Sequence, residues 1–126
     1  MARFVDKAIG EKNMKVSTTA RLFASQALWG LTGIDAIGRV LVEALAEEDE
    51  DVRTIAGVLL TKSGRRAEPL LGEALDQGKH VPMVISVLGS IGDRKVLPKI
   101  RPFAHSDDPQ VARAARYAIA VIEADP

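Results

Sequence analysis

The chain has 126 residues, the length of a single domain that can bury a stable core without disulfides or bound metal. It contains no cysteine, which excludes disulfides and thiolate metal sites and fits a cytoplasmic location. Seventeen basic and 17 acidic side chains cancel, and no uncharged run approaches the length of a membrane span. Because general nucleic-acid binders are usually basic, we do not expect nucleic acid as the main partner.

The neutral total hides an uneven distribution of charge along the chain. Residues 1–39 hold six basic and three acidic side chains, residues 40–78 hold four and nine, and residues 79–116 hold seven and three. The three segments therefore carry net charges of +3, −5 and +4. Charge stripes of this kind affect which partner a protein selects.

The first predicted element is a helix over residues 1–16 that caps the N-terminal end. Its apolar positions are Phe4, Val5, Ala8 and Ile9. Trp29 falls on the next helix, and we expect it to pack between that helix and the cap. Residues 17–46 form the first of three predicted helical pairs, and the others cover residues 49–77 and 78–105.

The pairs are recognised by an internal repeat. Residues 49–75 superpose on residues 78–104 with a shift of 29 residues, which places Leu59 on Leu88 and Pro69 on Pro98. A glycine follows each first helix, at Gly33, Gly64 and Gly92. Glycine is favoured there because it adopts the left-handed conformation that ends many helices. Pro69 and Pro98 fall in the opening turn of the second helix, where proline is tolerated.

The repeat also decides the role of Gly89-x-x-Gly92. This pattern can mark a loop that cradles phosphate, but Gly92 occupies the place that Gly33 and Gly64 occupy in the other units. A turn has to be repeated in every unit, whereas a phosphate site does not. We therefore predict that Gly92 forms a corner between two helices.

The last predicted element is a helix over residues 107–124 that caps the C-terminal end. Val111, Ala115, Ala118 and Ile122 face inward by their three-and-four spacing. The outward positions are Gln110, Arg113, Arg116 and Tyr117. A polar outer face is typical of the end of a helical stack.

The stretch SDDPQVARAARYAIAVIEADP carries a family resemblance. Asp108, Pro109, Val111 and Ala115 match the first helix of HEAT-like repeats, of the short type named for phycobilisome lyase subunits, although Ala112 replaces the usual arginine. The resemblance implies an all-α fold: a right-handed α-solenoid of about three HEAT-like helical hairpins with N- and C-terminal capping helices, in one domain over 1–126. From the mainly polar outer face of the C-terminal helix we expect a monomer or a weak end-to-end dimer.

The resemblance implies a non-catalytic scaffold or adaptor that binds another protein on a concave face lined by the second helices. These are predicted at residues 34–46, 66–77 and 94–105. We expect no catalytic residue, cofactor or metal. The predicted partner-binding residues are Arg39, Val42, Glu43, Leu70, Glu73, Lys95, Lys99 and Arg101.

Other interpretations stay open at this point. The protein could be an accessory subunit of a bilin lyase-like or other enzyme, or a helical-repeat nucleic-acid binder using the basic residues between Lys79 and Arg116. The acidic run at residues 46–51 is best explained as the start of a helix, whose positive end favours acids. His80 and His105 show no metal-binding spacing.

Overall fold

The computed structural model describes residues 2–124, and it describes side chains from Lys15 onward. Within this range the structure is all-α and contains no strand. The helices are α1 (Ala2–Thr32), α2 (Asp35–Glu43), α3 (Glu50–Ser63), α4 (Glu68–Asp76), α5 (Val81–Ile91), α6 (Leu97–Ile100) and α7 (Pro109–Ala124). Short 3₁₀ turns lie at η1 (Ala44–Ala46), η2 (Gly64–Arg66), η3 (Arg94–Val96) and η4 (Arg101–His105).

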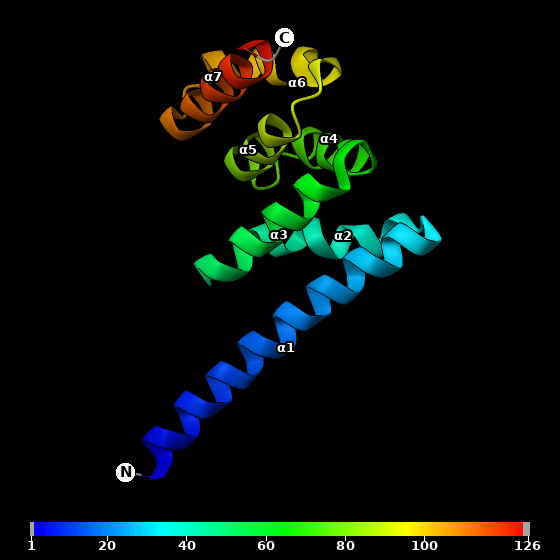
Figure 1. Ribbon diagram of the computed structural model, residues 1–126. Coiled ribbons are helices and arrows are strands. Elements are labelled where there is room, and N and C mark those ends of the chain that lie inside the picture. The colour runs from blue at the N-terminus through cyan, green and yellow to red at the C-terminus, as the bar shows by residue number, and fades with distance from the viewer. Residues whose placement is uncertain (1, 125–126) are drawn as a thin grey trace.

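The helices stack in chain order as an α-solenoid (Figure 1). The pairs α1–α2, α3–α4 and α5–α6 follow one another, and α7 closes the C-terminal end. The helices α3, α5 and α7 lie on one side and α2, α4 and α6 on the other (Figure 1). We call these the first-helix face and the second-helix face. The predicted all-α solenoid is confirmed.

The predicted boundary between a cap helix at 1–16 and the next helix is wrong, because α1 is a single helix of 31 residues. No glycine or proline lies near the expected break, so nothing ends the helix there. Its N-terminal half extends beyond α3 (Figure 1). A helix rises about 1.5 Å per residue, so Ile9 lies about 30 Å along the axis from Trp29 and cannot pack on it. The side chains of Phe4, Val5, Ala8 and Ile9 lie outside the described residues.

Trp29 packs instead between α1 and α2. The side chain is fully buried, and a Cβ atom built on Gly38 would lie 2.5 Å from the indole ring. Glycine is therefore required at Gly38 for α2 to approach this ring. The Arg66 guanidinium lies 5.9 Å from the ring centroid, within the range of a cation–π contact. Trp29 thus anchors the N-terminal end of the core.

The predicted glycine turns all have a positive φ, at Gly33, Gly64 and Gly92, but Gly64 has ψ −132° and so departs from the left-handed conformation, and the third unit differs in its second helix. Gly92 has φ 78° and ψ 18°, the left-handed conformation expected of a helix end. Pro69 and Pro98 lie in the opening turns of their helices. However, the helix predicted at 94–105 is broken into η3, α6 and η4. Pro102 lies two residues after the end of α6, within η4, and a proline there removes an amide donor that a continuing α-helix needs.

Gly89 has a different role from Gly92. It lies inside α5, is buried, and faces α7 so closely that a Cβ atom would be 2.9 Å from the Cβ of Ala118. Small residues on both helices therefore allow α5 and α7 to pack tightly. Gly89 therefore serves a contact between helices, and Gly92 forms the turn that ends α5.

Candidate functional site

The residues predicted to bind a partner lie on the second-helix face, and most of their charges are paired within the chain. Arg39 Nη2 lies 3.2 Å from Glu73 Oε2, which links α2 to α4. Lys99 Nζ lies 3.7 Å from Asp76 Oδ2, and Arg101 Nη2 lies 2.9 Å from Glu123 Oε1. These pairs connect successive units along the face.

The apolar contact expected from Val42 and Leu70 needs correction. These side chains are only 8% and 4% exposed, because the apolar sides of α2 and α4 turn into the core. With Arg39, Glu43 and Glu73 they line a shallow depression of about 160 Å³. The structure thus brings five of the eight predicted residues together, while Lys95, Lys99 and Arg101 belong to the third unit.

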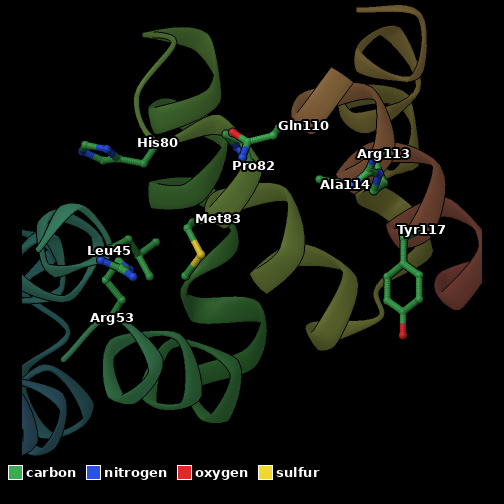
Figure 2. Close-up of a pocket in the computed structure, with 9 residues that line it drawn as sticks. All are labelled: Leu45, Arg53, His80, Pro82, Met83, Gln110, Arg113, Ala114 and Tyr117. Atoms are coloured by element: carbon green, nitrogen blue, oxygen red, sulfur yellow. The ribbon is translucent and has the colours of Figure 1, made fainter. Parts of the chain in front are cut away.

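A larger depression lies on the first-helix face, where the sequence analysis placed no site. We call it the first-helix groove, and its volume is about 710 Å³. Figure 2 shows Tyr117 and Arg113 on α7, Met83 on α5 and Arg53 on α3 around it. The lining residues are Leu45, Arg53, His80, Pro82, Met83, Gln110, Arg113, Ala114 and Tyr117. The outward positions predicted for Gln110, Arg113 and Tyr117 were the one sequence signal for it.

The local fold fixes the walls of this groove. The Arg53 guanidinium donates to the carbonyl oxygens of Glu47 and Glu48 at 2.8 and 2.9 Å, which holds α3 against the turn before it. His80 has φ 49°, a left-handed backbone conformation that few residues other than glycine adopt. It is the N-cap of α5, at the rim of the groove. Tyr117 is 73% exposed, so its ring is available to a partner.

The groove combines apolar surface with positive charge. Arg53 and Arg113 supply the positive charge, and none of the nine lining residues is acidic. A neighbouring depression of about 530 Å³ between α3 and α5 shares Arg53 and Met83, adds Val58 and Lys62, and also lacks acidic residues. The two depressions form a continuous surface suited to an apolar ligand that carries negative charge.

The acidic run at residues 46–51 begins α3, as predicted. Asp49 is the N-cap and accepts hydrogen bonds from the amides of Asp51 and Val52 at 2.8 and 3.3 Å. Lys15 of α1 pairs with both Asp49 and Asp51. Partial burial opposes ionisation of Asp49, but the two amides and Lys15 lower its pKa below the usual range. The run therefore ties α1 to α3.

Glu68 and Asp93 form a second carboxyl cluster, at the junction of the second and third units. Burial, and then the neighbouring Asp93 carboxylate, raise the pKa of Glu68. The pKa of Asp93 is lowered, first by the Lys95 amide, which donates to it at 3.0 Å, and then by the Glu68 side chain. Among the side chains that the structure describes, no group of three or more His, Cys, Asp or Glu residues could hold a metal ion.

The geometry defines a class before any comparison: a short solenoid of helical pairs with open surfaces on both faces. The family model of HEAT repeats matches residues 38–120. The chain therefore belongs to the HEAT-repeat family, whose members are generally protein-interaction scaffolds and typically non-catalytic. The phycobilisome lyase type stays a prediction. No curated protein and no solved structure gave a significant match.

None of the helices within residues 2–124 combines the length and the apolar character needed to cross a membrane.

Proposed function

We propose that the protein is a non-catalytic interaction scaffold that binds a segment of a partner protein in the first-helix groove. The observation that carries this proposal is the composition of the groove: apolar walls, an exposed tyrosine and flanking cations with no acidic residue. Tyrosine and arginine are enriched among the residues that dominate protein interfaces. The partner segment that fits is apolar on one side and acidic at its edges.

The charge of the groove supports this choice of partner. Arg113 lines the groove with Met83 and Tyr117, Lys62 lines the neighbouring depression with Met83 and Val58, and both cations are exposed. Exposed cations accelerate the encounter with an acidic segment and discriminate against basic ones. Burial of the apolar side of the segment then supplies most of the affinity.

The second-helix face is the other candidate for the same function. It keeps the predicted residues Arg39, Glu43, Glu73, Lys99 and Arg101 near the surface. However, its charged side chains form three ion pairs within the chain, so a partner would have to compete with these pairs. Tyr117 is the only aromatic residue of the groove, so stacking of bases or of a bilin has less support than a protein segment.

Affinity capture from the lysate of the source cell tests the proposal with two matched variants. The groove variant combines Arg113→Glu with Tyr117→Ser, and the second-helix variant combines Glu43→Lys, Glu73→Lys and Lys99→Glu. All five side chains lie at least partly at the surface, so we expect both variants to fold, which circular dichroism would verify.

We expect wild type and the second-helix variant to retain the same protein, and the groove variant to lose at least 90% of it, since a lost hot spot of about 1.4 kcal/mol or more weakens binding tenfold. Loss in the second-helix variant alone would move the site to that face. Recovery of nucleic acid alone would overturn the scaffold function.

A further inference from the structure

The outer face of α1 carries an apolar stripe at the N-terminal end of the stack. Val16, Phe23 and Leu31 are 67%, 53% and 84% exposed. Ala20, Ala24 and Ala27 lie between them and are also exposed. We call these six residues the α1 stripe. A contiguous apolar surface on a folded protein usually marks an interaction site.

The stripe lies opposite the side of α1 that packs on its own chain. At about 100° per residue, the six positions fall within an arc of about 100°. The buried residues Leu22, Ser25 and Trp29 lie on the opposite side, towards α2 and α3. The end helix of a solenoid normally presents a polar outer face, and α1 departs from this rule.

The stripe is self-complementary. Its members follow one another at spacings of 4, 3, 1, 3 and 4 residues, which read the same in both directions. A second α1 running antiparallel, with a two-fold axis between Phe23 and Ala24, places Val16 opposite Leu31 and Ala20 opposite Ala27. Phe23 then lies opposite Ala24 of the other copy, so that a large side chain meets a small one. Such an interface uses the same surface on both copies.

Charge argues against a charged occupant. Between Val16 and Leu31 the one charged residue is Arg21, which falls outside the arc of the stripe by position. Lys15, at its start, is directed to Asp49 and Asp51 of the same chain. A nucleic acid or an acidic segment would find no counter-charge on this surface.

We propose that the α1 stripe binds a second copy of this chain as an antiparallel helix pair around that axis. The stripe spans 16 residues, about 24 Å of helix. A helix pair of this length buries roughly 500–600 Å² per copy, less than the about 800 Å² of a standard interface. We therefore expect a reversible dimer that dissociates on dilution. This inference does not depend on the proposed function.

Sedimentation equilibrium of the full chain, from low-micromolar to submillimolar concentration, tests the dimer. We expect the mass to rise from 13.5 kDa towards twice that value. Ala20→Glu places a charge in the stripe without touching the core, and we expect it to weaken the dimer at least tenfold. The control Ala120→Glu makes the same change on the exposed face of α7 and should leave the dimer unchanged.

The register has its own test. In the double variant Ala20→Glu/Ala27→Lys, the antiparallel pair sets glutamate opposite lysine twice, so dimerisation should recover to within a few-fold of wild type. A parallel pair would set like charges opposite each other and would not recover. A wild type that stays monomeric, a dimer that tolerates Ala20→Glu, or a double variant without recovery would each overturn the proposal.

Discussion

The carboxyl groups of Glu68 and Asp93 each make the stability of the molecule depend on pH, in opposite directions. Burial and the neighbouring Asp93 carboxylate raise the pKa of Glu68 in the folded state. Folding therefore favours the protonated form of Glu68, and its contribution to stability falls as the pH rises above the usual glutamate value of about 4.3. Asp93 behaves in the opposite way: its lowered pKa stabilises the fold above about pH 3.9, and this is lost on acidification.

Glu68→Gln should therefore stabilise the protein at high pH. The amide cannot ionise, and it can donate a hydrogen bond to Asp93. We expect Tm to rise by about 2–4 °C at pH 8, and the difference from wild type to shrink towards pH 4.5. Thermal unfolding followed by circular dichroism at several pH values measures this.

Glu47→Gln, which removes the same charge from an exposed position, is the matched control. An equal rise in Tm for both variants would mean that total charge, and not the Glu68–Asp93 contact, is responsible.

Among the helices, α5 and α7 approach each other closely at Gly89. The approach depends on this residue being glycine, because a Cβ atom there would meet the Cβ and Cα of Ala118 at 2.9 and 3.1 Å. Because the Cα belongs to the backbone, the contact cannot relax by rotation of a side chain. The packing of α7, and with it the position of Tyr117 and Arg113 in the groove, rests on this glycine.

Gly89→Ala should lower the free energy of unfolding by about 1–3 kcal/mol, because the added methyl group separates α5 from α7. Gly57→Ala is the control inside another helix, where the nearest atom to a new Cβ would be 3.7 Å away. That change should stabilise α3 by up to about 1 kcal/mol, since alanine is the better helix former. Urea unfolding compares the two, and similar effects from both would refute the role given to Ala118.

At the scale of the molecule, the buried residues form one core from Leu22 in α1 to Ile122 in α7. Repeat proteins can unfold unit by unit when neighbouring units couple weakly. Here a continuous core in a short stack favours a single transition. Trp29, the only tryptophan, belongs to α1, and α1 lies at the end of the stack away from α7 (Figure 1). Its fluorescence therefore reports on coupling across the whole core.

Ile122→Ala removes a fully buried side chain from α7 and should cost about 2–5 kcal/mol. We expect the unfolding midpoint seen by Trp29 fluorescence to fall together with the midpoint seen by circular dichroism. The exposed Val121→Ala serves as control. A Trp29 transition that keeps its midpoint while circular dichroism splits into two steps would show that the units unfold separately.

The repeat, its turns and its inward positions could be read from the sequence because local chemistry fixes them. Gly92 and Pro98 act through backbone conformation alone, and Val111 and Ile122 through helical spacing. The length of α1 could not be read, since a boundary predicted from repeat periodicity has no physical signal at residue 16. The groove was missed because it joins α3, α5 and α7, and the packing of separate units leaves no pattern in any one of them.

The ion pairs of the second-helix face have a consequence for the order in which units can join. The α4 helix offers Glu73 to Arg39 of the preceding unit and Asp76 to Lys99 of the following one. Two α4 helices placed side by side would set acid against acid. Exposed pairs add at most about 1 kcal/mol each, so they contribute little to stability. Their effect is on specificity: opposite charges favour the native order of neighbouring units, and like charges disfavour the pairing of two α4 helices from different molecules.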